Sequence, residues 1–358
     1  MGKEQKVILQ ALMGLDIGGA ETHVVELSIE LRKRGYRVIV ASNGGVYEST
    51  LKNNGVELVK VPLHTKNPLA VIKSIRLLYN IIKKENINLV HAHARIPAFI
   101  LSLLQKQLAF TMFTTAHGIF HVNFLLKYIT RWGDQVFAVS KEVKNYLLEN
   151  YSVEESSIHE NINGINLEKF KSLVNVEENE YIVHVSRLEG NTSMIANLLI
   201  EYGKNHRDRK LIIVGGGEEL DGLRKSAHDF DNIHLPGKST DVGDYLGKAR
   251  VFIGVGRAAL EAMSCNIPVI LAGTFGYLGL LREDNIDFAA VNNFSARYTN
   301  EINYEALSMD LDQIFDNKDQ LDYSWERKYI EKNYSLDLMT DKYEEVYKLY
   351  LEDKYEEG

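Results

Sequence analysis

The sequence predicts an α/β protein with two Rossmann-like halves, each built around a parallel sheet. Two observations carry this prediction. Short apolar runs alternate with helical patterns along the chain, and the alternation lapses once near the middle before it resumes. The chain has 358 residues, 45% of them hydrophobic. That length suits two domains of roughly 150 to 180 residues better than a single core.

The first half opens with the apolar run Val7–Leu12, which predicts a buried strand. Apolar residues then recur at helical spacing over Glu21–Arg34, and Gly35 suits the left-handed cap that ends such a helix. Ser140 suits the N-cap of a later helix. The other predicted strands are Arg37–Ala41, Val56–Val61, Asn88–His91, Met112–Thr115 and Gln135–Val139. The other predicted helices are Leu69–Lys84, Ile96–Gln107 and Lys141–Glu149.

Residues 160–180 interrupt the pattern, because NINGINLEKFKSLVNVEENE is rich in Asn and Glu. We interpret this stretch as a linker. The predicted strands after it are Tyr181–Val185, Lys210–Val214, Asn232–Leu235, Val251–Ile253 and Pro268–Leu271. The predicted helices after it are Met194–Tyr202, Glu218–Ala227, Ala259–Cys265, Tyr304–Phe315 and Leu336–Tyr350.

Composition argues against several classes of protein. The formal net charge of -8 disfavours a nucleic-acid binder, which would carry a basic excess. Cys265 is the single cysteine, so no disulfide can form within the chain, and a reducing compartment is expected. Gln10 and Gly14 interrupt the first apolar run, which disfavours a secretory signal. We therefore expect a soluble, cytoplasmic protein.

The loops that leave strands are the first place to look for a site, because open α/β sheets bind ligands there. Two such halves predict a ligand cleft between them. In the first loop, Gly18 and Gly19 precede a helix whose first amides can hold an anion. A tight turn explains this pair equally well. The spacing is not GxGxxG, so a nicotinamide fingerprint is absent.

Four histidines follow two strands of the first half, in LVHAHAR and TTAHGIFH. His91 and His93 are two residues apart and therefore share a face of their strand, and we expect His91 to be structural. His117 stands at a strand exit and is the better candidate to bind a hydroxyl or a phosphate. A zinc site that includes His121 is disfavoured, because no carboxylate or cysteine joins the set at a recognised spacing.

Loops of the second half offer groups that suit a diphosphate. Arg187, in VSRLEGNTS, has a forked guanidinium that matches phosphate oxygens, although it can equally be a surface residue paired with Glu189. The next strand exit has three glycines, which either a ligand or close packing explains. These are Gly215, Gly216 and Gly217.

A glycine-rich turn enters a helix in FIGVGRAALEAMSCNIPVI. The helix start at Gly256, Arg257 and Ala258 can bind a diphosphate. Glu261 lies about one turn into this helix, where its carboxylate can accept two hydrogen bonds from a ribose. A solvated helix glutamate is the alternative interpretation.

In their order and spacing, these segments resemble the family 4 glycosyltransferases, which have the two-domain GT-B fold. The resemblance covers nearly the whole chain. It includes GGAETHVVELSIELRKRGYRVIV, LVHAHAR, TTAHG, VFAVSKEV and NINGINLEKF in the first half, and VSRL, LIIVGGGEEL and ALEAMSCNIPVI in the second. It implies an N-terminal domain of residues 1–168, completed by helices at about 330–358, and a donor domain of residues 169–329.

The resemblance implies a hexosyltransferase that moves a sugar from a UDP- or GDP-sugar to a glycan, glycolipid or other acceptor. It also implies that the anomeric configuration is retained and that neither a metal nor another cofactor is needed. By matching position, Arg187 binds the donor phosphates and Glu261 the ribose. Gly18 and Gly19 lie near the phosphates or sugar, and His117 contacts the sugar and its leaving group. The loop beside the base is Gly237, Lys238 and Ser239.

Two positions depart from the family pattern. Ile253 stands where the family often has a glutamate beside the donor sugar, and Thr192 stands near a usual phosphate-binding lysine. Arg257 can supply a replacement charge. These departures favour, as an alternative, a weak or inactive donor-binding partner subunit of a glycosyltransferase complex. A nucleotide-sugar epimerase is disfavoured, because the paired carboxylates for that chemistry are not evident.

Basic and apolar residues occur together in three segments of the first half, PLAVIKSIRLLYNIIKK, FILSLLQKQLAF and NFLLKYITRW. The first has Lys73, Arg76, Lys83 and Lys84 beside Ile, Leu and Val. A basic amphipathic helix can lie on an anionic membrane, which would place the protein peripherally on the inner membrane face. Ordinary packing on the sheet explains the apolar residues equally well.

Overall fold

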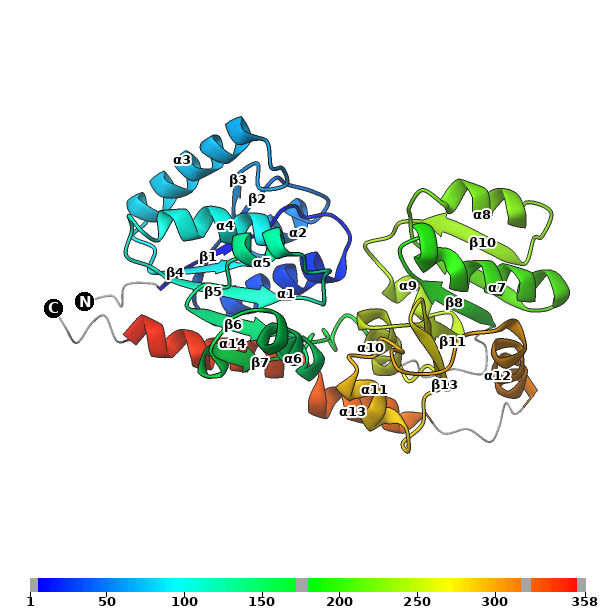
Figure 1. Cartoon of the computed structure of the whole chain (residues 1–358). Helices are drawn as coiled ribbons and strands as arrows, with labels where there is room; N and C mark the ends of the chain where they lie inside the picture. Colours follow the sequence, from blue (N-terminus) through cyan, green and yellow to red (C-terminus); the bar gives the residue numbers. More distant parts are fainter. Residues whose placement is uncertain (1–5, 172–179, 317–322, 353–358) are drawn as a thin grey trace. The chain divides into compact units, whose positions relative to one another are not determined.

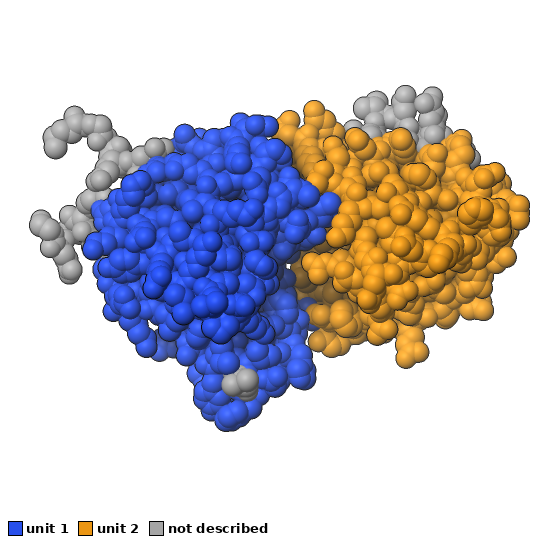
Figure 2. Space-filling view, turned by 90° about the horizontal axis from the view of Figure 1, so that it is seen from above, with its two compact units in different colours: residues 1–164, 336–358 blue, residues 165–335 orange. Residues whose placement is uncertain are grey.

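The computed structural model describes residues 6–171, 180–316 and 323–352. The chain forms two compact units, coloured in Figure 2: unit 1 is residues 1–164 with 336–358, and unit 2 is residues 165–335. Each unit has a parallel-rich sheet covered by helices, so the predicted α/β class is confirmed. Residues 172–179 of the predicted linker and 353–358 at the end of the chain lie outside the described residues.

The described part of unit 1 contains a seven-stranded parallel sheet in the order β3-β2-β1-β4-β5-β6-β7 (Figure 1). Its strands are β1 (Val7–Ala11), β2 (Arg37–Ser42), β3 (Glu57–Lys60), β4 (Leu89–Ala92), β5 (Thr111–Ala116), β6 (Gln135–Ala138) and β7 (Ile158–Glu160). Its helices are α1 (Gly19–Lys33), α2 (Glu48–Asn53), α3 (Pro68–Lys84), α4 (Arg95–Leu104), α5 (Phe124–Ile129), α6 (Lys141–Asn150) and α14 (Leu336–Glu352). The strand order reverses between β1 and β4, which opens a crevice at their carboxyl ends.

Helices bury both faces of this sheet, which is why its central strands β1 and β2 are mostly apolar. Successive residues of β1 face opposite sides: Ile8 packs with α1 and α14, and Leu9 packs with α3 and α4. The predicted caps are confirmed. The Ser140 hydroxyl accepts a hydrogen bond from the Val143 amide at 3.2 Å, and Gly35 has a φ of +96°.

The last helix of the chain, α14, packs against α1 in unit 1. Its Tyr343 and Tyr347 are fully buried, and they bring two hydroxyl groups beneath the loops that leave β4 and β5. At the end of α1, Arg34 also bonds to α14. Its guanidinium donates to Asp341 at 2.5 Å and to Glu344 at 3.0 Å. The described residues include no helix with both the length and the hydropathy to cross a bilayer.

The described part of unit 2 contains a six-stranded sheet in the order β10-β9-β8-β11-β12-β13. Its strands are β8 (Tyr181–Val185), β9 (Lys210–Val214), β10 (Ile233–Gly237), β11 (Ala249–Gly254), β12 (Val269–Gly273) and β13 (Gly276–Leu280). Its helices are α7 (Met194–Asn205), α8 (Leu220–Ala227), α9 (Gly243–Leu246), α10 (Arg257–Ser264), α11 (Ile286–Val291), α12 (Tyr304–Asp316) and α13 (Ser324–Asn333). Only the edge strand β13 runs antiparallel among these described strands.

Helix α13 buries an ionisable side chain, Glu326, completely. Burial raises the pKa of Glu326 well above its usual value, and the nearby Val269 amide offsets this only in part. The folded chain therefore keeps this carboxyl group protonated at pH values where the unfolded chain releases the proton. The contribution of Glu326 to the free energy of unfolding is therefore most favourable below the unfolded-state pKa, near 4.3. This contribution falls as pH rises toward the folded-state pKa.

We expect Glu326→Gln, which stays neutral, to raise the Tm increasingly from pH 4 through pH 6 to pH 8. A gain of 1 kcal/mol corresponds to about 2–4 °C for a domain of this size. Thermal denaturation followed by circular dichroism measures the difference. Glu283→Gln, at an exposed position of the same unit, is the control and should show no such trend. Equal effects of Glu326→Gln at pH 4 and pH 8 would contradict the prediction.

Candidate functional site

Four adjacent parallel strands of unit 2 end at the same edge of its sheet. The loops that leave them contain Arg187 after β8, Gly215 after β9, Lys238 after β10 and Gly256 after β11. The strand pairing therefore brings the predicted phosphate, base and helix-start residues to one edge. This edge, from Arg187 to Glu261, is called the unit 2 site below.

The loop after β8 exposes Arg187 and fixes the backbone that carries it. The Thr192 hydroxyl lies 2.6 Å from the Arg187 carbonyl oxygen and 2.7 Å from that of Glu189, and it accepts from the Glu189 amide at 3.3 Å. Thr192 therefore shapes the short 3-10 turn Gly190–Ser193 rather than standing free for a phosphate. In the described structure, no ion pair joins Arg187 to Glu189.

Close packing accounts for the glycines after β9. A Cβ on Gly215 would lie 1.9 Å from the Ser186 carbonyl oxygen, and one on Gly217 would lie 2.2 Å from that of Leu188. The loops after β8 and β9 can therefore touch only where glycine is present. The packing partner is the backbone of the loop after β8.

The predicted base loop begins at Gly237, which has a φ of +93°. Lys238 follows and is exposed, and its side chain lies across Gly216, where a Cβ would meet Lys238 Cγ at 2.5 Å. The Ser239 hydroxyl accepts from the Asp241 amide at 3.1 Å and closes the turn. Lys238 thus places a second cation on the same edge as Arg187.

Helix α10 begins after a connection of only two residues, Val255 and Gly256. Gly256 has a φ of +63°, and its amide donates to the Phe294 carbonyl at 2.7 Å. One turn into the helix, Arg257 Nε lies 2.9 Å from Glu261 Oε1, with the two side chains 10% and 9% exposed. Glu261 is therefore not a solvated helix glutamate. It belongs to a largely desolvated ion pair at the helix start.

Ile253, which stands where the family often has a glutamate, belongs to the core of unit 2 in this chain. Ile253 lies inside β11, pairs in register with His184 and Ile270, and is fully buried in the core. Its side chain belongs to a buried hydrophobic cluster of unit 2, because the residue lies within the strand rather than in the loop that follows it.

His184 is a buried polar residue beside the unit 2 site that was not predicted from the sequence. His184, in the apolar strand β8, donates from Nδ1 to the Ile253 carbonyl at 2.8 Å. Burial lowers the pKa of His184 to about 4, so Nε2 is an acceptor for the Ser186 hydroxyl, 2.8 Å away. His184 thereby ties β11 to the start of the Arg187 loop. A histidine within an apolar strand just before VSRL was the available signal.

A second group of polar residues lies at the carboxyl ends of β1, β4 and β5 in unit 1. His93 Nδ1 lies 3.1 Å from His117 Nε2, and His93 Nε2 lies 2.6 Å from Gln10 Oε1. His23, from α1, places its ring edge-on to His117 with centroids 4.9 Å apart. Burial lowers the pKa of His117 to about 4, which keeps its ring neutral near pH 7.

The four histidines predicted from the sequence do not all converge. His91 stacks on His93 with ring centroids 4.1 Å apart, as their shared face predicts. His91 is fully buried and bonded to Tyr347 and to Thr115, so its structural role is confirmed. His121 is exposed. Within the described residues, no three His, Cys, Asp or Glu side chains are grouped so that they could hold a metal ion.

Gly18 and Gly19 begin α1 beside this histidine group, Gly18 as the N-cap and Gly19 as the first helical residue. A Cβ on Gly19 would meet no atom within 4 Å, and its backbone is not in the left-handed region. The fold therefore places no steric demand on Gly19. Packing therefore does not explain why Gly19 is glycine. A ligand that approaches the helix start would explain it.

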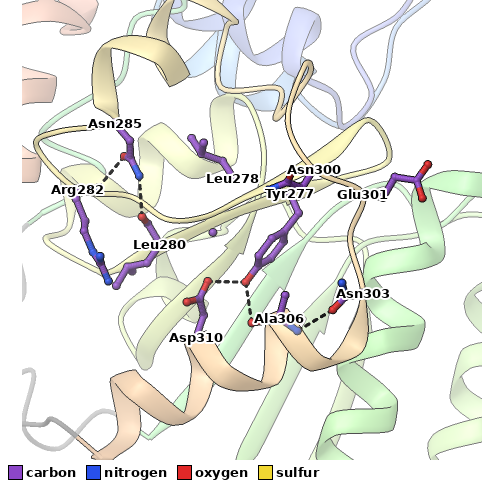
Figure 3. A pocket seen from close by; sticks show the side chains of 11 residues that line it. Tyr277, Leu278, Leu280, Arg282, Asn285, Asn300, Glu301, Asn303, Ala306 and Asp310 are labelled. Atoms are coloured by element: carbon purple, nitrogen blue, oxygen red, sulfur yellow. Dashed lines mark hydrogen bonds between the residues drawn. The ribbon is translucent and has the colours of Figure 1, made fainter.

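A cavity of about 410 Å3 opens elsewhere in unit 2, between β13 and α12 (Figure 3). Tyr277 crosses it and donates to Asp310 at 2.5 Å, while Asn285 and Asn303 bond to neighbouring backbone groups. Tyr277, Asp310, Asn285 and Asn303 therefore already have hydrogen-bond partners within the unit. It lies along the antiparallel edge strand, away from the carboxyl ends where open α/β sheets bind ligands.

The chain matches two family models that together span both units. Residues 17–169 match Glycosyltransferase Family 4, and residues 166–328 match Glycosyl transferases group 1. The chain belongs to the family 4 glycosyltransferases. This family 4 glycosyltransferase also has the GT-B fold that the sequence predicted.

Relatives and solved structures agree with this assignment. An uncharacterized glycosyltransferase of Methanocaldococcus jannaschii is 26% identical over 90% of this chain and 95% of its own. A glycosyltransferase structure from Rickettsia africae superposes with a TM-score of 0.76 at 23% identity, covering 97% of this chain and 99% of that one. Anabaena HepE, solved with UDP-glucose, superposes with a TM-score of 0.73 at 14% identity, covering 95% and 98%.

Proposed function

We propose that this family 4 glycosyltransferase moves a hexose from a UDP- or GDP-sugar to a glycan, glycolipid or other acceptor, with retention and without a metal. The observation that carries the proposal is the unit 2 site. There, two exposed cations, a helix start and the carboxylate of Glu261 lie at one sheet edge. A nucleoside diphosphate has the matching groups, because its phosphates suit cations and helix amides and its ribose hydroxyls suit a carboxylate.

Each group then has one role. Arg187 and the first free amides of α10, at Arg257 and Ala258, bind the diphosphate, and Glu261 accepts hydrogen bonds from the ribose. Gly256, whose amide is held by the Phe294 carbonyl, leaves room for the phosphates at the helix start. The loop of Gly237, Lys238 and Ser239 lies beside the base. His117 contacts the transferred sugar, with Gly18 and Gly19 close to the donor. The UDP-glucose bound to Anabaena HepE supports this donor class, since that protein has the same fold.

A thermal-shift screen of UDP, GDP, UDP-glucose and GDP-mannose tests the donor class. A ligand that binds the folded chain stabilises it and so raises its Tm. The gain in the free energy of unfolding is about 2.7 kcal/mol when the ligand concentration is 100 times the dissociation constant. We expect a rise with one nucleotide series and slow hydrolysis of its sugar. Gly19→Val should keep the ligand-free Tm and lower hydrolysis. His117→Ala should lower hydrolysis as well, with a lower Tm because His93 loses this hydrogen-bond partner.

No shift with any of these ligands would refute the donor assignment. Binding without hydrolysis or transfer, over a panel of glycan and lipid acceptors, would favour the inactive partner subunit instead. The structural role of Thr192 is the observation that keeps this second function in view, because it leaves Arg187 without a neighbouring lysine on the same loop.

Unit 1 also presents apolar side chains to solvent beside basic ones. In α5, Phe124 is 79% and Tyr128 is 62% exposed, and Lys127 lies between them in sequence. Arg131 follows and caps the helix end by donating to the Tyr128 carbonyl. A cavity of about 420 Å3 adjoins it, lined by Phe99, Ser102, Leu103, Gln105, Lys106 and Arg131. We propose that this surface touches an anionic membrane on its cytoplasmic face.

The sequence left two interpretations open for α3, packing on the sheet and contact with a membrane, and the helix has features of both. Its Leu78 and Ile82 are buried against the sheet, so ordinary packing explains part of its apolar content. Its outer face exposes Leu69 and Ile72 beside basic residues. The exposed basic residues of this face are Lys73, Arg76, Lys83 and Lys84.

We expect the protein to sediment with vesicles that contain phosphatidylglycerol, and less so as salt rises, because salt screens exposed charges. Phe124→Ser with Tyr128→Ser should reduce sedimentation several-fold. Met309→Ser, which removes a side chain of similar exposure from unit 2, is the matched control and should leave it unchanged. Equal binding to neutral phosphatidylcholine vesicles would contradict the membrane proposal.

A further inference from the structure

A line of three side chains joins the loop after β5 to the buried centre of unit 1. His117 Nε2 lies 3.1 Å from His93 Nδ1, and His93 Nε2 lies 2.6 Å from Gln10 Oε1. Gln10 is fully buried and His93 nearly so, whereas His117 is partly exposed. The line therefore begins at a fixed acceptor inside the unit and ends at a ring that meets solvent.

Hydrogen-bonding rules set the proton positions along this line. The Gln10 oxygen can only accept, so His93 Nε2 carries a hydrogen. Burial lowers the pKa of His93 well below its usual value, so the ring holds that one proton and Nδ1 is an acceptor. His117 Nε2 must then donate to His93. Because the pKa of His117 is lowered to about 4, its Nδ1 carries no proton near pH 7.

The exposed nitrogen of His117 is the end of the line that a ligand can reach. Nδ1 makes no hydrogen bond to the described residues and is not among their buried unpaired atoms. The neighbouring His23 directs its two nitrogens elsewhere, to Asn163 at 3.2 Å and to Tyr343 at 3.0 Å. His117 Nδ1 therefore meets solvent with a bare lone pair.

We propose that Gln10 and His93 are positioning residues that hold His117 in the Nε2–H form, so that its Nδ1 accepts a hydrogen bond from a hydroxyl group of the substrate. The hydroxyl part of this inference rests on the proposed function. A phosphate oxygen at neutral pH only accepts hydrogen bonds, and it has no attraction for a bare lone pair. The sequence left hydroxyl and phosphate open for His117, and the direction of the line decides for the hydroxyl.

Nitrogen and carbon NMR of the histidine-labelled full chain tests the proton positions without any ligand. His117→Gln identifies the His117 signals by their loss. We expect the Nε2–H form at pH 7 in the wild type. Gln10→Met removes the acceptor at similar volume and should raise the Nδ1–H fraction of His117 several-fold, while Gln10→Glu keeps an acceptor and should restore the Nε2–H form.

Two outcomes would overturn the positioning role. A wild-type His117 in the Nδ1–H form would mean that the Gln10 amide group donates to His93. An unchanged His117 form in Gln10→Met, with circular dichroism showing a folded chain, would mean that Gln10 does not set it. Neither outcome depends on donor binding, so failure of the proposed function cannot be mistaken for failure here.

Ligand titration tests the hydroxyl. UDP-glucose, or GDP-mannose if the thermal-shift screen selects guanosine, should move the Nδ1 signal of His117, and the bare nucleoside diphosphate should not. An equal shift with the diphosphate alone, or no shift with a nucleotide sugar that is shown to bind, would overturn the hydroxyl assignment. Absence of binding by every ligand would instead refute the donor class and leave the measured proton positions standing.

Discussion

Glu261→Ala should lower donor turnover by at least about 100-fold while the chain stays folded. The variant removes a carboxylate that we assign to two ribose hydroxyls. Hydrogen bonds to a charged group contribute about 1.5–3 kcal/mol each, and about 1.4 kcal/mol corresponds to a tenfold change in rate. The measurement is kcat/KM for donor hydrolysis or transfer, with the Tm recorded in parallel.

The ion pair with Arg257 makes a single variant ambiguous. Arg257 Nε lies 2.9 Å from Glu261 Oε1, and both side chains are about nine-tenths buried. Glu261→Ala therefore leaves a poorly hydrated guanidinium without this partner, which costs stability whether or not the carboxylate binds ribose. Arg257→Ala should also lower donor affinity if its charge replaces the usual lysine.

The double variant Arg257→Ala/Glu261→Ala separates the two roles. If the pair is only structural, removing both charges recovers most of the Tm that either single variant loses, and turnover recovers with it. We expect the Tm to recover and turnover to stay low. Joint recovery of both would refute the ribose role of Glu261, and unchanged donor affinity in Arg257→Ala would refute its compensating charge.

Strands buried on both faces are the ones that local sequence predicts most directly. The apolar runs at β1, β8 and β9 are short, continuous and bounded by polar residues or glycine, and such runs suit the centre of a parallel sheet. Strand β13 was missed because Gly276 and Gly279 weaken its strand pattern and because it is an antiparallel edge. Helix α13 was missed because its sequence, SWERKYIEKN, is mostly polar.

Some residues of the candidate site also had a local sequence signal, and others had none. Arg187 and Glu261 follow strands within recognisable loops, so their shared sheet edge could be predicted from the order of the strands. The Arg257–Glu261 pair also had a local signal, since the residues are four apart on a helix. The bond between His23 and Tyr343 had none, because 320 residues separate them and only the packing of α14 brings them together.

Gly215→Ala should be among the most destabilising single changes in unit 2, at about 3 kcal/mol from steric overlap and backbone strain. The added Cβ would lie 1.9 Å from the Ser186 carbonyl oxygen, which is backbone and cannot rotate away. The loop after β8 must then move, and Arg187 moves with it. We expect the Tm to fall by roughly 6–12 °C. Donor affinity should fall as well.

Gly222→Ala is the matched control, because it adds the same methyl group to the same unit. Gly222 lies in α8, and a Cβ there would meet no atom within 4 Å. Alanine favours the helix over glycine by about 0.5–1 kcal/mol, so this variant should raise the Tm slightly and leave donor affinity unchanged. The two alanine variants thus have opposite expected signs. A Gly215→Ala protein as stable as Gly222→Ala would mean that the loop after β8 yields freely, and the rigid placement of Arg187 would have to be abandoned.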